Sequence, residues 1–284
     1  MSFPQPIFVG GSAASGTHAM GELIGADPRY RMIETEARFH CAPGGVCDVI
    51  EGRAGVAVLR RRTLGKWWKR GGEGDKGLQR LVERSTLEAA LDRFESELAD
   101  EPWEAGRRLI GAVLDPVAER DGKPAWVDIS GNNIRVAPAL LRLFPTARLV
   151  HTYRDGRAVA ASIVHKRNMT DDPKAALAHW GHRMRVTGAT LAAVPPDAVL
   201  TVPLDDLTAH RREEVFRSLV EFLEIDDEGP MREHFERHVS AERAHVGAWR
   251  ERLEPGVADW VEAAHAELVA ELRAEGIAWV VEPS

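Results

Sequence analysis

The start of the chain places the strongest limit on the fold. A short apolar segment, Ile7–Val9, ends at Gly10-Gly11, and a helical pattern of apolar residues follows over residues 19–24. A strand that passes through a glycine-bearing turn into a helix is the opening unit of a parallel α/β sheet. We therefore expect an α/β fold built on this first strand and first helix.

The rest of the chain continues the alternation of strand and helix patterns. Predicted strands lie at residues 31–33, 126–128, 148–153 and 198–202, and predicted helices at 86–99, 104–120, 137–144, 156–166, 174–193, 211–223 and 256–275. This order predicts a parallel β-sheet flanked by helices, in a single domain over residues 1–284. Residues 53–120 are predicted as a mostly helical insertion or lid region within that domain.

Charge and composition exclude several classes of protein. Thirty-seven basic residues against 44 acidic ones give a net charge of −7, which argues against a nucleic-acid binder. No apolar run is long enough to span a membrane, and the first eleven residues lack the basic start of a secretory signal. Cys41 and Cys47 are too few for a disulfide framework, and reduced thiols are favoured over a mutual bridge. We expect a soluble, cytoplasmic protein.

The loop between the first strand and first helix has the form of a phosphate-binding loop. Gly11 and Gly16 have the spacing at which backbone N–H groups and a helix N-terminus cradle an anion. A nucleoside triphosphatase would carry Lys and then Ser or Thr after the second glycine, but Thr17 and His18 follow here. This argues against an ATPase or kinase, and a plain strand-to-helix turn is the alternative.

A second segment, around the strand at 148–153, also has phosphate-binding chemistry. Arg154 follows that strand, at the sheet edge where open α/β sheets bind ligands. Ser162 comes eight residues later, about two turns into the next helix. A guanidinium and a hydroxyl so placed can hold a phosphate together. The alternative is a local Arg154–Asp155 ion pair, with Ser162 as a small packing residue.

Together the two segments resemble the motifs of sulfotransferases that use 3′-phosphoadenosine 5′-phosphosulfate (PAPS), particularly the bacterial branch. The family's first motif is an apolar strand, a basic residue and Ser-Gly-Thr, matched here by residues 8–17. Its second motif, a strand ending in Arg-Asp and then Arg-Ala-Val with a helical serine, is matched by residues 154–162. Weaker matches cover residues 143–148, 202–207 with 222–223, and 244–250, so the similarity extends along most of the chain.

The resemblance implies a P-loop-like sulfotransferase fold and a sulfotransferase activity. Sulfonate would pass from PAPS to a hydroxyl or amine of a small-molecule or carbohydrate-like acceptor, leaving adenosine 3′,5′-bisphosphate, with no metal required. By this resemblance Arg154 and Ser162 hold the 3′-phosphate, and Arg243 falls where a further basic residue contacts it. The 5′-phosphosulfate would lie against the loop residues Ala13, Ala14, Ser15, Gly16, Thr17 and His18.

The sequence departs from the family pattern at Ala14, where relatives carry the basic residue that precedes Ser-Gly-Thr. That residue neutralises charge developing on the leaving phosphate. His18, expected in the first helical turn, is the nearest candidate to replace the cation. Its alternative role is that of a neutral hydrogen-bonding side chain.

A general base is needed to take the proton of the acceptor hydroxyl. Glu34 and Glu36 follow the second predicted strand and would face the same way on an extended chain. Glu36, shortly before Arg38-Phe39, best fits the position at which bacterial relatives often place a Glu. His40 is the second candidate, and the alternative for Glu36 is a simple ion pair with Arg38.

Residues 53–80 stand out by charge, with nine basic residues against two acidic ones and with Trp67 and Trp68 among them. Such a segment is usually a solvated surface. As a functional segment it would be a lid over an acceptor, with the tryptophans as stacking surfaces. The sequence does not identify the acceptor or the oligomeric state. A P-loop kinase using ATP and a non-catalytic adenosine-bisphosphate-binding relic are the alternative functions.

Overall fold

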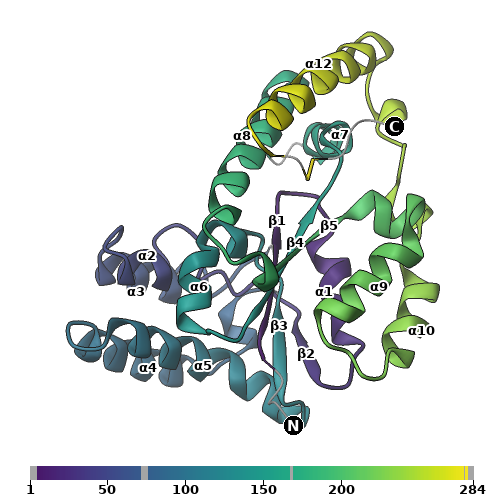
Figure 1. The fold of residues 1–284 in the computed structure, drawn as a ribbon. Coiled ribbons are helices and arrows are strands. Elements are labelled where there is room, and N and C mark those ends of the chain that lie inside the picture. Colours follow the sequence, from purple (N-terminus) through teal and green to yellow (C-terminus); the bar gives the residue numbers. More distant parts are fainter. Residues whose placement is uncertain (1–4, 72–75, 167–168, 278, 281–284) are drawn as a thin grey trace. The chain divides into compact units, whose positions relative to one another are not determined.

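The computed structural model describes residues 5–71, 76–166, 169–277 and 279–280 (Figure 1). A five-stranded sheet with the order β2-β3-β1-β4-β5 forms the centre of the fold. Its strands are β1 (Ile7–Gly11), β2 (Tyr30–Ile33), β3 (Ala125–Asp128), β4 (Arg148–Tyr153) and β5 (Val199–Pro203). Residues 1–4 belong to the stretch for which the sequence predicted no secretory signal, and they lie outside the described residues, as do residues 72–75 of the basic segment.

The strand pairing confirms the prediction of a parallel sheet. β3 pairs in parallel with β2, with Tyr30 opposite Ala125, and with β1, with Ile7 opposite Val127. Every residue of β1 and β3 is buried. Strands covered on both faces are apolar throughout rather than alternating, which is why short continuous apolar runs marked them in the sequence.

The predicted helices are present within a few residues of their expected bounds. They are α1 (Thr17–Gly25), α4 (Arg84–Glu97), α5 (Pro102–Arg120), α6 (Ala137–Leu143), α7 (Gly156–Lys166), α8 (Pro173–Leu191), α9 (Arg212–Phe222) and α12 (Pro255–Ala274). The structure adds helices that the sequence analysis missed: α2 (Val46–Ile50), α3 (Val56–Leu64), α10 (Gly229–His238) and α11 (Ala241–Ala244).

The chain divides into two compact units. The first comprises Met1–Gly10 and Met20–Leu149, and the second comprises Gly11–Ala19 and Val150–Ser284. In the first unit α5 packs on β2 and β3, and α4 packs on α5. The region 53–120, predicted as mostly helical, contains α3, α4 and α5. Cys41 and Cys47, also in this unit, are buried free thiols.

The second unit is built around three helices. α8 packs on α7, and α12 packs on both (Figure 1). Their shared core includes Tyr153, Trp180, Met184 and Leu272, all at most 3% exposed. This packing surrounds the turn between β4 and α7, where Arg154 lies. None of the described helices combines the length with the apolar character needed to cross a bilayer.

Candidate functional site

The loop after β1 is shaped by two glycines. A Cβ at Gly11 would overlap the Thr152 carbonyl oxygen and the Ser15 hydroxyl. Gly16 has φ +87°, and a Cβ there would come within 2.7 Å of a Leu204 methyl carbon. Both positions therefore require glycine, one for close approach and one for backbone conformation.

Ser15 is the buried centre of this loop, at 1% exposed. Its hydroxyl donates to the Ser12 carbonyl at 2.8 Å and lies 3.2 Å from the Thr152 hydroxyl. Its amide also donates to the Ser12 carbonyl, at 3.3 Å. Because Thr152 is two residues before Arg154, the two motif segments recognised in the sequence meet within the second unit.

The remaining loop positions lie nearer the surface. Ala14 has φ +59°, a left-handed conformation that is uncommon outside glycine, and it is partly exposed. Ala13 and His18 are exposed, whereas Thr17, which begins α1, is partly exposed. The first turn of α1 holds no acidic residue, so nothing there opposes binding of an anion.

Arg154 follows Tyr153, the last residue of β4, and is only 8% exposed. Its Nη2 donates to the carbonyl of Ala244 and, at 3.3 Å, to that of His245. Its Nε lies 3.8 Å from Oδ1 of Asp205. The guanidinium is thus held between the segment after β5 and the loop after α11.

The Arg154–Asp205 ion pair does not satisfy all the polar atoms of the two side chains. Burial lowers the pKa of Arg154 and raises the pKa of Asp205, and in each case the partner's charge opposes the shift. Among the described residues, neither Arg154 Nε nor Asp205 Oδ1 has a hydrogen-bond partner. A buried guanidinium in this state gains from an additional anion.

The alternative of a local Arg154–Asp155 ion pair does not describe this turn. The Asp155 carboxylate instead binds Arg157, with Nη2 at 2.7 Å and Nε at 3.1 Å from its oxygens. Burial would raise the pKa of Asp155, but the hydrogen bonds and the charge of Arg157 lower it. Asp155 therefore stays ionised beside Arg157, and Arg154 faces Asp205.

The other predicted 3′-phosphate residues lie in the same unit. Ser162 is 5% exposed, in the buried stretch of α7. Arg243 is exposed on α11, where its Nη1 lies 3.3 Å from His238 Nδ1. Arg154 thus lies beside two backbone carbonyls and a carboxylate, Ser162 lies in the buried part of a helix, and Arg243 lies at the surface.

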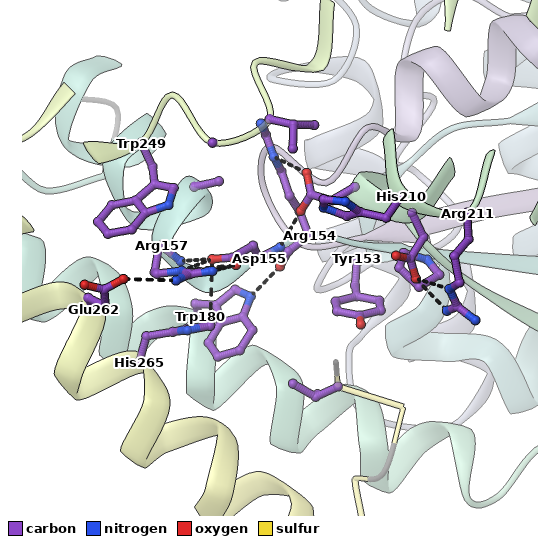
Figure 2. Close-up of a pocket in the computed structure, with 17 residues that line it drawn as sticks. Tyr153, Arg154, Asp155, Arg157, Trp180, His210, Arg211, Trp249, Glu262 and His265 are labelled. Atoms are coloured by element: carbon purple, nitrogen blue, oxygen red, sulfur yellow. Dashed lines mark hydrogen bonds and ion pairs between the residues drawn. The ribbon is translucent and has the colours of Figure 1, made fainter. Parts of the chain in front are cut away.

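A cavity of about 420 Å³ lies beside Arg154 (Figure 2). Its aromatic walls come from Tyr153, Trp180 and Trp249, and His265 of α12 also lines it. This volume is within the range of small-molecule sites. Of the predicted site residues only Arg154 is on its wall; Ser162, Arg243 and residues 13–18 are not.

The predicted base lies in the first unit, just after β2. Glu36 accepts a hydrogen bond from Arg38 Nε at 2.6 Å, so the ion pair weighed as an alternative is present. Arg70 adds a second cation, with Nη1 3.6 Å from the Glu36 carboxylate and Nη2 donating to the Glu36 carbonyl at 2.7 Å. Two arginines therefore fix the position of Glu36, whose side chain is 31% exposed.

The premise that Glu34 and Glu36 share one side of an extended strand is wrong. β2 ends at Ile33, and the chain bends at Glu34 and Thr35. Glu34 pairs with Arg31 at 3.0 Å, and its side chain is 62% exposed. The two carboxylates therefore lie in different surroundings, and only Glu36 is held by arginines from two segments.

His40, the second candidate base, is completely buried. Its Nε2 lies 2.8 Å from Asn133 Oδ1 and 3.3 Å from Asp128 Oδ2. Burial alone would lower the pKa of His40, but Cys41 and Asp128 raise it well above the usual value. This burial and pairing favour a structural role for the ring in holding residues 36–40 against β3.

The basic segment at residues 53–80 is only partly the solvated surface that its charge indicates. Trp67 is 3% exposed, so the expectation that it offers a stacking surface is wrong. Trp68 is partly exposed and faces Arg84, 5.5 Å from its ring centre. Arg70 reaches Thr35 and Glu36 and thereby connects this segment to the predicted base.

Sequence reasoning missed Asp205, Arg70 and His265 as residues around these sites. Asp205 carried a usable signal, because it closely follows β5, at the same sheet edge as Arg154. Arg70 and His265 carried none, since their contacts lie 34 and 109 residues away in the chain. Among residues 5–71, 76–166, 169–277 and 279–280, no three His, Cys, Asp or Glu side chains group as metal ligands.

Comparison with solved structures supports the fold. The sulfotransferase domain of the Synechococcus PCC 7002 olefin synthase superposes with a TM-score of 0.55 at 18% identity, covering 99% of this chain and 97% of that one. The sulfotransferase domain from the curacin biosynthetic pathway gives 0.53 at 12% identity, covering 93% and 98%. At these identities the likeness concerns the fold alone.

Comparison of sequences identifies the family. A Drosophila melanogaster protein-tyrosine sulfotransferase is 23% identical over 224 residues, which is 77% of this chain. The matched part spans only 38% of that relative's length. Residues 6–229 match the model of the sulfotransferase family. This match covers both motifs around Gly16 and Arg154, and the chain accordingly belongs to the sulfotransferase family.

Proposed function

We propose that this chain transfers sulfonate from PAPS to a hydroxyl or amine of a small-molecule or carbohydrate-like acceptor. The acceptor oxygen or nitrogen attacks sulfur and forms the new bond to it. The bond from sulfur to the 5′-phosphate oxygen breaks in line, and its electron pair leaves with adenosine 3′,5′-bisphosphate. The proton of the acceptor passes to a general base, so atoms and charge balance without a redox partner.

The observation that carries this proposal is the junction of the two motif segments. The Ser15 and Thr152 hydroxyls meet at 3.2 Å, next to a buried Arg154 at the end of β4. We propose that the loop amides and the start of α1 bind the 5′-phosphosulfate and that Arg154 binds the 3′-phosphate. Ser162 and Arg243 are the proposed additional 3′-phosphate contacts, and Glu36 is the proposed base.

A single-turnover assay tests the proposed function. Purified protein is mixed with ³⁵S-labelled PAPS and with hydroxyl, amine and carbohydrate acceptors, and products are followed by label and by mass. We expect label transfer, and adenosine 3′,5′-bisphosphate to bind more tightly than ATP. Phosphate transfer from ATP would identify a kinase instead. Tight bisphosphate binding with no transfer to any acceptor would identify a non-catalytic binder.

We predict that His18 supplies the cation that is missing at Ala14. His18→Ala should lower turnover, because charge on the leaving phosphate is then less well neutralised. Ala14→Lys should partly restore turnover in the His18→Ala background. Alanine already adopts a left-handed conformation at position 14, with φ +59°. Lysine also has a Cβ, so this substitution adds no further backbone strain. The measurement is the single-turnover rate for the wild type, both single variants and the double variant.

Unchanged turnover in His18→Ala would remove this residue from the mechanism. Ala19→Ser is a matched control, because Ala19 is equally exposed in the next position of α1. It should leave the rate unchanged.

A further inference from the structure

Side chains from three other parts of the second unit bind the turn Arg154-Asp155-Gly156; Figure 2 shows two of them, Trp180 and His265, beside Arg154 and Asp155. Trp180 of α8 donates its indole N–H to the Arg154 carbonyl at 3.1 Å. Asp205 accepts the Asp155 amide at 3.3 Å. His265 of α12 accepts the Gly156 amide through Nε2 at 3.2 Å. Two consecutive peptide groups are thus fixed: Trp180 and Asp205 bind the group between Arg154 and Asp155, and His265 binds the group between Asp155 and Gly156.

The contact between His265 and Gly156 caps a helix from a distance. Gly156 is the first residue of α7, where an amide has no partner within the helix. His265, only 2% exposed, provides that partner from 109 residues further along the chain. The packing is tight, because a Cβ at Gly156 would come within 2.7 Å of both the His265 and Trp180 rings.

A role in packing alone does not explain a histidine here. The ring lies 5.1 Å from the Trp180 ring, and its Nδ1 is buried with no hydrogen-bond partner among the described residues. Burying an unpaired polar atom costs stability, which an apolar residue of similar size would avoid. The gain from the histidine is the hydrogen bond to Gly156 and, through it, the placement of the turn that carries Arg154.

We propose that His265 is a positioning residue for donor binding: its neutral ring holds the turn so that the Arg154 guanidinium faces the 3′-phosphate of the donor. This inference rests on the proposed function, since it concerns the arginine assigned to that phosphate. His265 touches neither substrate nor reacting atoms. It acts through the peptide group between Asp155 and Gly156 and, through that group, on the one between Arg154 and Asp155.

The protonation state of His265 decides whether its ring can accept the hydrogen bond from the Gly156 amide. A protonated imidazole has no acceptor nitrogen, so the Gly156 contact requires the neutral ring. Burial lowers the pKa of His265; Asp155 opposes this shift and Arg157 adds to it. Three side chains surround the His265 ring. Asp155 lies 3.8 Å from its Nε2, Arg157 binds Asp155, and Trp180 of α8 packs beside the ring. On α12 itself, Glu262 faces Arg157 at 3.6 Å.

The sign of the expected pH effect follows from this lowered pKa. The neutral ring is favoured at neutral pH and remains so below 6.5, the usual pKa of histidine. As the pH falls through the lowered pKa, protonation breaks the Gly156 contact and donor affinity falls with it. Because the unfolded chain takes up the proton at the ordinary pKa of 6.5, folding stability declines as the pH falls from 6.5 to the lowered pKa and then levels off.

Two variants separate positioning from packing. His265→Gln keeps an acceptor without titrating, and His265→Leu keeps an apolar side chain of similar size without an acceptor. Binding of adenosine 3′,5′-bisphosphate is measured by calorimetry at pH 7.5 and at a series of lower pH values, down to the lowest at which the wild type stays folded, beside adenosine 5′-phosphosulfate, which lacks the 3′-phosphate. At pH 7.5 we expect His265→Leu to lose roughly tenfold in bisphosphate affinity, the scale of one hydrogen bond, and His265→Gln to lose much less.

The comparison of pH values gives the second readout. Over this pH series wild-type affinity should fall further than that of His265→Gln, whose remaining slope reports the ligand's own titration. Adenosine 5′-phosphosulfate should show little change with either variant. If His265→Leu does not fold, the pH comparison and the bisphosphate affinity of Trp180→Phe test the inference instead. Trp180→Phe removes the hydrogen-bond donor to the Arg154 carbonyl.

The outcomes that overturn the inference differ from those that overturn the proposed function. Equal bisphosphate affinity in wild type and His265→Leu, or equal losses for both ligands, would make His265 a packing residue. Identical pH slopes in wild type and His265→Gln would contradict the role of the neutral ring. Failure of folded wild-type protein to bind the bisphosphate even at pH 7.5 would instead contradict the proposed function.

Discussion

Arg154→Ala is expected to weaken binding of adenosine 3′,5′-bisphosphate by about 2–5 kcal/mol, the usual loss when one partner of a buried, hydrogen-bonded charge pair is removed. The guanidinium is 8% exposed, so the proposed phosphate contact is shielded from water and from salt. Removing it would also leave Asp205 without its opposing charge. Titration calorimetry with the bisphosphate measures the loss directly.

The specificity of that loss is checked with a second ligand and a second arginine. Adenosine 5′-phosphosulfate lacks the 3′-phosphate, so its affinity should change much less. Arg211→Ala is a matched control, because Arg211 also lines the cavity but is half exposed and bound to Asp206. Equal losses for both ligands in Arg154→Ala would mean that the residue maintains the fold rather than binding the 3′-phosphate.

Glu36→Gln is expected to lower turnover by roughly 10²–10⁴-fold, the range typical of general acid–base catalysis. The amide keeps the shape of the side chain but cannot take the acceptor's proton. Affinity for the bisphosphate should stay nearly unchanged, because the proposed base acts on the acceptor. Single-turnover rates with saturating PAPS, together with calorimetry, separate the two effects.

Glu34→Gln is the control, with the same chemical change two residues earlier. Because Glu34 is exposed and paired with Arg31, its substitution should alter turnover little. Loss of transfer in Glu34→Gln alone would show that the base lies one strand period earlier. If neither variant slows transfer, the role of base passes to His40, although its ring is buried and bound to Asn133.

Two arginines hold the proposed base Glu36 in place. Arg38 binds its carboxylate, and Arg70 approaches both its carbonyl and its carboxylate. These contacts fix the orientation of the side chain. They also explain why a residue from the basic segment at 53–80 belongs with the predicted base.

Much of the fold was predictable, because its strands and longer helices carry their own signal. β1 and β3 contain short apolar runs, β4 combines apolar residues with polar ones, and α4 and α5 have one apolar face each. Helices without such a face were missed. α10 begins Gly-Pro and buries only Met231 and Phe235, and it is stabilised by contacts such as the stacking of Phe235 on Phe216 of α9 at 4.6 Å.

The sequence by itself determined the family and the two motif segments, because Gly11, Gly16 and Arg154 stand at fixed distances from strand ends. Only the tertiary structure decided what surrounds them: Asp205 and the Ala244 carbonyl at Arg154, Arg70 at Glu36, and His265 at Gly156. Local periodicity records which face of an element is buried. Hydrogen bonds between residues tens of positions apart depend on how whole elements pack, and no spacing in the chain records that.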